Sequence, residues 1–322
     1  MTVFRTLAIA SAIAVSSVCS VTSYAAQKLT VAHSTWIGYG ALYIAKEKGY
    51  FEKAGLDVDL RIVEASSDAL AAMLGGRIDV VASTIDNFTL FAGNGADLSL
   101  IVATDESSGG DGIVSKKDIS SVADLKGHTV AVQMGSVSQF MLSQALDKAG
   151  LTVGDVKTID MKSGDAGAAF VAGRVDAAVS WQPWLSKAAA TNFGKILIDT
   201  RSMPGLIVDA LAARSDFAKE HQSDFKAFVD AYFEGVDFMN KDPDAAKDII
   251  ARNLKMTKES VEASLKDVRL FAKRDNTDFF SGSESAGLKL VTEAGKFYNR
   301  VGVLRATADP AKVVGIAPDL SK

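Results

Sequence analysis

Cysteine, histidine and proline are scarce in this chain of 322 residues, which holds 1 cysteine, 3 histidines and 5 prolines. The cysteine, Cys19, lies in a segment that we expect to be removed. The mature chain is therefore expected to have no disulfide, no thiolate nucleophile and no cysteine metal site. No carboxylate or cysteine accompanies the histidines at metal-ligand spacing. We expect no metal and no cofactor.

Motifs of catalysis and nucleotide binding are also missing. The sequence contains no G-x-S-x-G elbow, no P-loop and no Rossmann glycine fingerprint. The formal net charge is −4, and no basic run or basic-aromatic cluster is present. These absences favour a binding protein over an enzyme, and they argue against a nucleic-acid partner.

The long apolar run of the chain lies at its N-terminus. Arg5 supplies a positive charge, Leu7 to Val21 carries none, and Ser23-Tyr24-Ala25 has the small-x-small form of a signal peptidase site. The run is short for a membrane span. We predict that residues 1–26 are a cleaved signal peptide, that the mature protein is periplasmic, and that it is not inserted in the membrane. A lipid-attached Cys19 is the alternative, but the residue before it is not small.

Two stretches 97 residues apart are nearly the same, Ala71–Ser83 and Ala168–Ser180. Each reads as the end of a helix of small residues, a glycine, an Arg-[Ile/Val]-Asp turn and a short buried strand. Upstream of each lies a second echo, Thr-Val-Ala at Thr30 and at Thr129. A period near 100 residues predicts two domain-sized lobes, and a cleft between lobes is a favoured site for a small ligand.

Alternating strand and helix signals predict a mostly parallel sheet covered on both faces. The expected strands are 29–33, 58–63, 78–82, 98–103, 113–115, 130–133, 156–161, 175–180, 196–198 and 206–213. Helices are expected at 41–51, 86–92, 138–149 and 165–172, and Ser67-Asp68 is expected to cap the helix of the first repeat. From residue 216 on, the chain reads as helix, interrupted by a polar stretch at 274–285.

Parallel α/β sheets bind ligands beyond the carboxyl ends of their strands. The loops at that edge are Ser34–Tyr39, Ser83–Asn87, Asp105–Asp111, Gly135–Ser138, Lys162–Asp165 and Trp181–Trp184. Among them, Trp36 and Trp181 either fill core space or form an aromatic wall against a ligand cation. We favour Trp181 over Trp184 because it lies nearer to its strand. Ser136 opens a helix, where it either caps the helix or helps to bind an anion, and Tyr39 holds the mirror position.

Several aspartates lie at this edge or at the crossings between lobes: Asp86, Asp105, Asp111 and Asp209. Any one of them is placed to pair with a ligand ammonium, and the others to cap loops. Asp79 and Asp176, by contrast, precede their strands, so we expect structural roles for both.

Motifs spread over the mature chain carry a family resemblance. They are Ala45–Phe51, Gly55–Val58, Gly76–Asp79, Asp124–Gly127, Val130–Val132, Gly173–Ala177 and Trp181–Trp184. With them the chain resembles the periplasmic substrate-binding proteins of ABC importers for nitrate, taurine and aliphatic sulfonates. The resemblance implies an α/β, two-lobed periplasmic-binding-protein fold, in which two similar α/β domains are joined by two hinge crossings. Lobe 1 would comprise residues 27–107 and 206–322, and lobe 2 residues 108–205. The matching crossings are Asp105–Gly112 and Arg201–Leu206.

The same resemblance implies a monomeric, non-enzymatic solute-binding protein that works with an ABC permease and its ATPase. In taurine-binding relatives an acid after the return crossing holds the ammonium, and Asp209 matches it. Trp181 matches a tryptophan of their second lobe, and Ser136 is the sulfonate candidate. The expected ligand-binding residues are Trp36, Tyr39, Asp86, Asp111, Ser136, Trp181 and Asp209.

Two questions stay open at this point. The acid-rich loop Asp105–Asp111 suits a cationic nitrogen compound, such as a guanidino or amino-pyrimidine ligand, better than a free anion. A taurine-like solute and a cation are therefore both expected ligands. A lyase or cofactor-precursor synthase on the same fold, and a receptor that signals rather than transports, are the rival functions.

Overall fold

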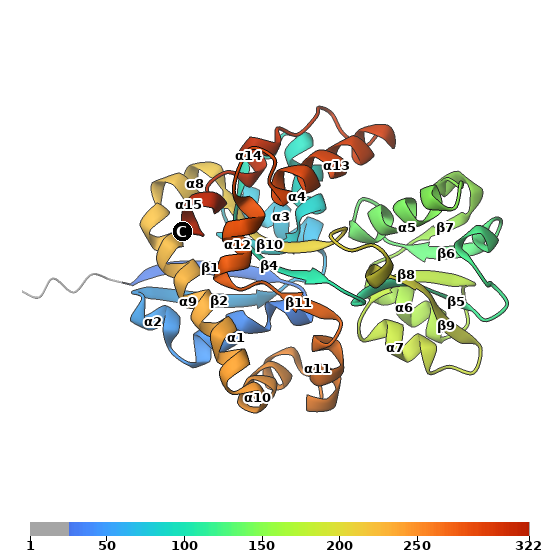
Figure 1. Cartoon of the computed structure of the whole chain (residues 1–322), viewed down its shortest axis with the longest axis horizontal. Helices are drawn as coiled ribbons and strands as arrows, with labels where there is room; N and C mark the ends of the chain where they lie inside the picture. Colours follow the sequence, from blue (N-terminus) through green and yellow to red (C-terminus); the bar gives the residue numbers. More distant parts are fainter. Residues whose placement is uncertain (1–25, 322) are drawn as a thin grey trace, which may run out of the picture.

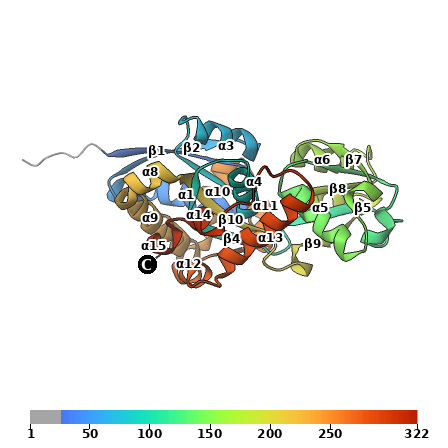
Figure 2. The ribbon, with the colours of Figure 1, turned by 90° about the horizontal axis from the view of Figure 1, so that it is seen from above.

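The computed structural model describes residues 26–321 and shows two lobes joined by two segments of chain (Figures 1 and 2). Lobe 1 is built on a six-stranded sheet and lobe 2 on a five-stranded sheet. Residues 1–25, which include Cys19 and most of the predicted signal peptide, lie outside the described residues. Between residues 26 and 321, no helix combines the length and apolar character that a membrane crossing requires.

The sheet of lobe 1 has the strand order β11-β4-β10-β3-β1-β2. Its strands are β1 (Gln27–His33), β2 (Leu56–Ile62), β3 (Val80–Thr84), β4 (Leu98–Ser107), β10 (Val208–Arg214) and β11 (Val268–Leu270). β1 runs parallel to β2 and β3, whereas β10 runs antiparallel to both β3 and β4, and β11 antiparallel to β4. The sheet is therefore mixed: β1, β2, β3 and β4 run in one direction, in keeping with the predicted mostly parallel sheet, whereas β11 and β10, which returns from the other lobe, run against them.

Lobe 2 repeats this plan with the strand order β7-β6-β8-β5-β9. Its strands are β5 (Asp111–Lys116), β6 (Thr129–Val132), β7 (Lys157–Asp160), β8 (Ala177–Trp181) and β9 (Gly194–Asp199). β6 is parallel to β7 and β8, and β5 is antiparallel to β8 and β9. β3 and β8, the strands of the two sequence repeats, thus hold equivalent places. The glycines before them, Gly76 and Gly173, both have φ of 72°, a left-handed conformation that favours glycine.

Helices cover both faces of the lobe 1 sheet. They are η1 (Ile37–Tyr39), α1 (Gly40–Glu47), α2 (Tyr50–Lys53), α3 (Ser66–Leu74), α4 (Ile85–Gly93), α8 (Ser215–Glu220), α9 (Gln222–Lys241), α10 (Pro243–Leu254), α11 (Lys258–Leu265), α12 (Lys273–Phe280), α13 (Ala286–Arg300), α14 (Pro310–Val314) and α15 (Ala317–Leu320). On one face, Phe51 stacks on Phe228 of α9, with Tyr232 buried beside them. On the other face, Phe88 and Phe271 are buried in a second apolar cluster.

Three local predictions for lobe 1 need correction. The helix expected at 41–51 is two helices, because Gly49 has φ of 71° and ends the first one. The polar stretch at 274–285 contains α12, whose Asn276 side chain bonds both backbone groups of Ala103 in β4. Finally, α3 begins at Ser66 without a side-chain cap, so Ser67-Asp68 lies inside its first turn.

The helices of lobe 2 are η2 (Val122–Leu125), α5 (Val137–Lys148), η3 (Val153–Asp155), α6 (Ser163–Val171), α7 (Trp184–Ala189) and η4 (Thr200–Ser202). Met141 and Leu142 of α5 are buried in one apolar cluster of this lobe. Phe170 of α6 and Leu185 of α7 are buried in another. Lobe 2 therefore has cores of its own, as a separately packed unit requires.

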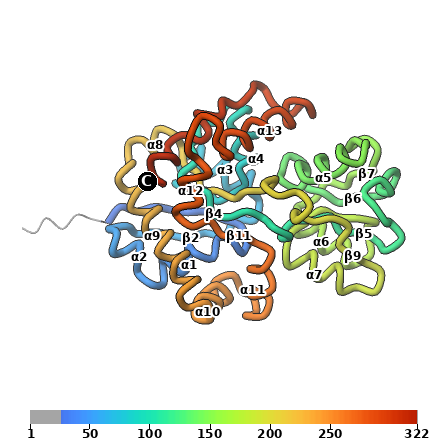
Figure 3. The backbone as a smooth tube through the Cα atoms, in the orientation of Figure 1, coloured from blue at the N-terminus to red at the C-terminus, as the bar shows by residue number. Residues whose placement is uncertain are grey.

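The chain crosses between the lobes from β4 to β5 and again from β9 to β10 (Figure 3). Further contacts hold the lobes together. Phe140 of α5 packs on Phe297 of α13 with ring centroids 5.0 Å apart. Asp267, which precedes β11, accepts hydrogen bonds from Gln182 and from Arg201 on the return crossing. The lobes are thus in contact on both sides of the crossings, whereas their division after residues 107 and 205 stays a prediction.

Candidate functional site

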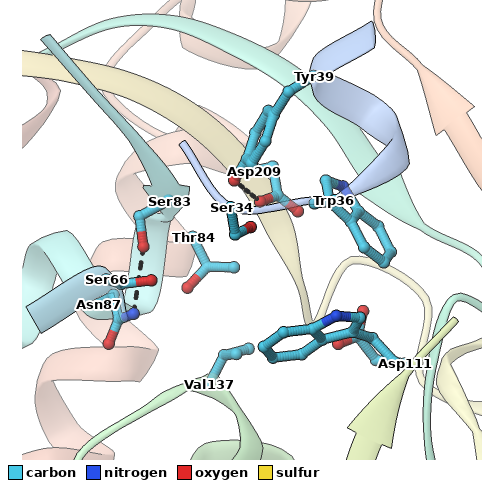
Figure 4. A pocket seen from close by; sticks show the side chains of 11 residues that line it. Ser34, Trp36, Tyr39, Ser66, Ser83, Thr84, Asn87, Asp111, Val137 and Asp209 are labelled. Atoms are coloured by element: carbon cyan, nitrogen blue, oxygen red, sulfur yellow. Dashed lines mark hydrogen bonds between the residues drawn. The ribbon is translucent and has the colours of Figure 1, made fainter. Parts of the chain in front are cut away.

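A cavity lies between the lobes, at the edge where β1, β3 and β8 end and where β5 and β10 begin. Its volume is about 40 Å³, within about 370 Å³ of space that includes open solvent. The lining residues are Ser34, Trp36, Tyr39, Ser66, Ser83, Thr84, Asn87, Asp111, Val137, Trp181 and Asp209 (Figure 4). A space of this size accommodates a small head group or a few waters, so a larger solute requires the lobes to part.

Both lobes contribute to this cavity. Asp111 begins β5, Val137 begins α5 and Trp181 ends β8, so these three side chains come from lobe 2. The other lining residues come from lobe 1. Because β5 and β10 run against the parallel strands, their first residues lie at the same edge as the carboxyl ends of β8 and β3. Sheet topology thus brings Asp111 and Asp209 to the site although 98 residues separate them in sequence.

Five of the seven residues predicted to bind a ligand line this one cavity. They are Trp36, Tyr39, Asp111, Trp181 and Asp209. Their role in binding a ligand stays a prediction. The strand-end rule selected Trp36, Tyr39, Asp111 and Trp181, and Asp209 was selected by its position after the return crossing.

Asp86 and Ser136 do not line the cavity. Asp86 is buried in the first turn of α4, where the hydroxyl of Tyr298 from α13 donates to its Oδ2 at 2.8 Å. Ser136 is the N-cap of α5: its hydroxyl accepts from the Ser138 backbone N–H and donates to the Gln133 carbonyl. The Ser136 hydroxyl is therefore engaged in capping, which was one of its two expected roles.

Sequence reasoning missed Ser66, which begins α3 and lines the cavity. The signal was available, because Ser66 lies in the connection that follows β2 and so obeys the same strand-end rule. The predicted loop Lys162–Asp165 contributes no lining residue. Trp184 does not line the cavity either; its ring lies under the ammonium of Lys187 at 4.3 Å, and its side chain fills the space beside Gly167.

Three carboxyl groups are buried at the site. Asp209 accepts a short hydrogen bond from the hydroxyl of Tyr39, which Figure 4 shows pointing toward it. Asp105 faces Asp209 across the β4–β10 pair and accepts from Trp36 Nε1 at 2.9 Å and from the Thr104 hydroxyl. Asp111 of lobe 2 lines the cavity. The Trp36 indole is thereby fixed by a buried acid directly behind the cavity.

Burial raises the pKa of all three groups. The pKa of Asp105 is raised to about 7, although hydrogen bonds from Trp36 and Thr104 oppose the shift. Burial also raises the pKa of Asp111 to about 7, with Ser107 opposing and Asp105 and Asp86 adding to the shift. For Asp209, burial and the charge of Asp105 raise the pKa well above its usual value. The physical cause is the same in each case: a charge is removed from water without receiving an opposite charge.

No positive side chain compensates these acids. Within residues 26–321, Asp86, Asp105, Asp111 and Asp209 form no ion pair, and neither lysine nor arginine lines the cavity. In the same part of the chain, no group of three or more His, Cys, Asp or Glu residues is arranged to hold a metal ion. The site is therefore a negatively polarised pocket that lacks a counter-charge.

Two tryptophans accompany the acids. Trp181 is paired with Asp111 across the β5–β8 ladder, so an indole and a carboxyl group lie side by side on the lobe 2 wall. On the lobe 1 wall, Trp36 packs against Gly110 so closely that a Cβ at residue 110 would overlap the indole ring. Aromatic faces beside carboxylates are the combination that binds organic cations in proteins.

Asp79 and Asp176 have the structural roles expected of them. Asp79 accepts from the backbone N–H of Thr30 at 2.8 Å, and Asp176 accepts from that of Thr129 at 2.9 Å. Each aspartate thus ties the turn before one repeat strand to the neighbouring parallel strand.

Comparisons with known proteins agree with this fold. The model of the family described as "NMT1/THI5 like" matches residues 36–246, and the chain belongs to that family. It is 30% identical over 234 residues to a protein of Bacillus subtilis (strain 168) named "Putative aliphatic sulfonates-binding protein", a match that covers 70% of each chain. It is 29% identical to a "Putative binding protein" of Brucella abortus (strain 2308), with 72% of this chain and 75% of that protein covered.

Among solved structures, the periplasmic aliphatic sulphonate binding protein SsuA from Escherichia coli superimposes with a TM-score of 0.76. The match covers 92% of this chain and 99% of that chain at 20% sequence identity, so it bears on the fold alone. The predicted periplasmic-binding-protein fold and the predicted family resemblance are both confirmed.

Proposed function

We propose that this protein is an exported solute-binding protein of an ABC importer, which captures a small amine-bearing solute between its lobes and delivers it to a membrane permease. The observation that carries the proposal is the cavity itself, because residues of both lobes line it at the strand edge where such folds bind ligands. The names of the family relatives, which describe binding proteins, support the same function. Export to the periplasm and a monomeric state belong to the proposal.

Five residues form the proposed ligand contacts. Asp111 and Asp209 are the acceptors for a protonated nitrogen, while Trp36, Trp181 and Tyr39 supply aromatic walls. The hydroxyls of Ser34, Ser66, Ser83 and Thr84 line another part of the cavity. Such hydroxyls, beside the start of α4, suit the anionic end of a zwitterion such as taurine.

Two ligand classes remain within the proposal. A taurine-like zwitterion uses the carboxylates and the hydroxyls together, and a cationic nitrogen compound uses the carboxylates and the indoles. A free sulfonate or nitrate fits less well, because it would be enclosed beside carboxylates without any lysine or arginine.

An enzymatic role on the same fold is the second candidate, and it has weaker support. A general base requires a group that contacts the substrate and exchanges protons near neutral pH, and Asp111, which lines the cavity and whose pKa burial raises to about 7, meets the second condition. Within residues 26–321, the Tyr39 hydroxyl donates to Asp209 and the Thr104 hydroxyl donates to Asp105, and Thr104 does not line the cavity. Recovery of the ligand unchanged after binding supports the solute-binding function, and its conversion to a product supports the enzyme.

Thermal unfolding of the exported protein against a ligand panel tests the proposal. The panel contains taurine, alkanesulfonates, nitrate, guanidino compounds and amino-pyrimidines. A ligand present at a hundred times its dissociation constant stabilises the folded state by about 2.7 kcal/mol, which is enough to move the unfolding midpoint visibly.

The variant Asp209→Asn examines the proposed amine contact. We expect affinity for amine ligands to fall at least about tenfold, because a hydrogen bond to a charged group is lost, while the fold persists. Asp68→Asn, on the exposed first turn of α3, removes the same charge outside the cavity and serves as the control. If the two variants bound amine ligands with equal affinity, Asp209 would not be part of the binding site.

A further inference from the structure

The arrangement of the lobes in this structure buries three acids that form no ion pair with any residue between 26 and 321. Asp105 is fully buried, Asp209 is 4% exposed and Asp111 is 6% exposed. Lobe 2 supplies part of the cover, because Val137 and Trp181 complete the cavity wall. When the lobes part, water reaches the carboxylates that line the cavity; when they meet, those carboxylates lose it. Removing water from an ionised carboxylate without a partner is strongly unfavourable.

Other contacts favour the closed arrangement. Phe140 of lobe 2 packs against Phe297 and Tyr298 of lobe 1, and Leu90 belongs to the same apolar cluster. Arg201 adds a bond to Asp267 across the lobes. Closure is therefore a balance between apolar and polar contacts at the periphery, which favour it, and uncompensated negative charge at the centre, which opposes it.

We propose that a positive charge on the solute is what permits closure: the site takes an organic cation or the cationic end of a zwitterion, and the lobes close when that charge neutralises Asp111 of lobe 2 and Asp209 of lobe 1. This inference rests on the proposed solute-binding function and specifies its ligand class and its trigger. Neutral molecules of the same shape enter the open site but do not close it.

Independent features of the cavity point to such a ligand. Thr84 is buried and lines the cavity, and its hydroxyl has no hydrogen-bond partner of normal geometry within residues 26–321. The indole of Trp181 is partly exposed and lines the cavity beside Asp111. The Thr84 hydroxyl lies next to the buried Asp86 carboxyl group, so the indole beside the carboxyl group of Asp111 is the feature that a bound cation satisfies.

The titratable side chains around Asp111 and Asp209 supply no positive charge, so we infer that the ligand supplies it. From the elements packed around the site come Asp86 of α4, Asp105 of β4, and the hydroxyls of Tyr39, Tyr232 and Tyr298. His33, whose ring lies 6.0 Å from that of Tyr39, is buried and bonded to Tyr43 and Ser34, and burial lowers its pKa. Among residues 26–321, the titratable groups named here around Asp111 and Asp209 are therefore acidic or neutral.

Closure without any ligand tests the inference most directly. The double variant Asp111→Asn/Asp209→Asn keeps the shapes of both side chains and removes both charges. The control Asp68→Asn/Asp165→Asn removes one charge from each lobe at equivalent exposed positions, in the first turns of α3 and α6. Small-angle X-ray scattering at pH 8 reports the separation of the lobes for the wild type and both variants.

We expect the wild type and the control to be open and the Asp111→Asn/Asp209→Asn protein to have the smaller radius of gyration of the closed form. A variant as open as the wild type overturns the inference, and so does a wild type that is already closed at this pH. Each single variant, measured in the same way, is expected to lie between the two states.

Probe pairs that differ in charge complete the test. Benzamidine and benzamide, choline and 3,3-dimethylbutan-1-ol, and taurine and isethionate each pair a cationic group with a neutral replacement of similar size. We expect closure and at least about tenfold tighter binding for the charged member of a pair that fits the cavity. Closure by a neutral or purely anionic member refutes the inference but leaves the solute-binding function standing. If no member binds, the charge-neutral variant still decides the inference.

Discussion

Asp86 offers a prediction whose size follows from its surroundings. This carboxyl group is 1% exposed, accepts a hydrogen bond from Tyr298 and has the Thr84 hydroxyl beside it, but it receives no positive charge from either. Burial raises its pKa from 3.8 to about 6. The substitution Asp86→Asn keeps the acceptor for Tyr298 and removes the buried charge. The variant is therefore expected to be more stable than the wild type at neutral pH.

The sign and magnitude follow from proton linkage. The unfolded chain releases this proton near pH 3.8 and the folded protein near pH 6, so the folded state binds more protons between those values. Stability must then fall as the pH rises through this window. A difference of about 2 pKa units corresponds to a penalty of about 3 kcal/mol, present in full above pH 6 and absent below pH 3.8.

Urea unfolding of the wild type and Asp86→Asn at several pH values between about 4 and 8 measures this directly. We expect the variant to gain about 3 kcal/mol over the wild type at pH 8, and the gain to vanish toward pH 4. Asp68→Asn controls for the loss of a negative charge on an exposed helix turn. A difference that does not depend on pH would refute the reasoning, because it would show that Asp86 is not ionised and buried at neutral pH.

Two further variants follow from contacts described above. Asp176→Ala leaves Thr129 and Lys116 without their acceptor, so we expect the free energy of unfolding in urea to fall by about 2 kcal/mol while the ligand affinity stays the same. An unaltered unfolding midpoint would contradict this prediction. Gly110→Ala places a methyl group against the Trp36 indole, so we expect this variant to bind the ligand more weakly. Gly154→Ala in η3 is the control, because an added Cβ there lies 3.6 Å from the nearest atom, in Thr152. If calorimetry gave the two glycine variants the same ligand affinity, Trp36 would not be part of the binding site.

The sequence was informative where periodicity and position in the chain determine structure. The repeat around Gly76 and Gly173 predicted two equivalent strands, and both lie in equivalent places of their sheets. Strand-end loops predicted most of the cavity lining, because the edge at which a parallel strand ends follows from chain direction alone. The same argument excluded Asp79 and Asp176 from the candidate ligand-binding residues, because both precede their strands.

Other features depend on contacts that a single sequence does not reveal. The antiparallel entry of β10 depends on the path of the return crossing, so the mixed character of the sheet was not predicted. Asp86 lies in a predicted strand-end loop, yet its side chain turns to Tyr298, a residue 212 positions away. The split between α1 and α2 arises at Gly49, which periodicity placed inside one helix. In each case a distant partner or a local backbone angle decided the outcome.

The position of β10 also constrains how the molecule assembles. β10 lies between β3 and β4 at the middle of the lobe 1 sheet, yet it is made after the whole of lobe 2. Until residues 208–214 are available, β3 and β4 have no common neighbour, and the helices that follow cannot cover the sheet. Lobe 2, by contrast, is continuous in sequence from β5 to β9. We therefore expect lobe 2 to fold first as the chain emerges, and lobe 1 to fold around the returning strand afterwards.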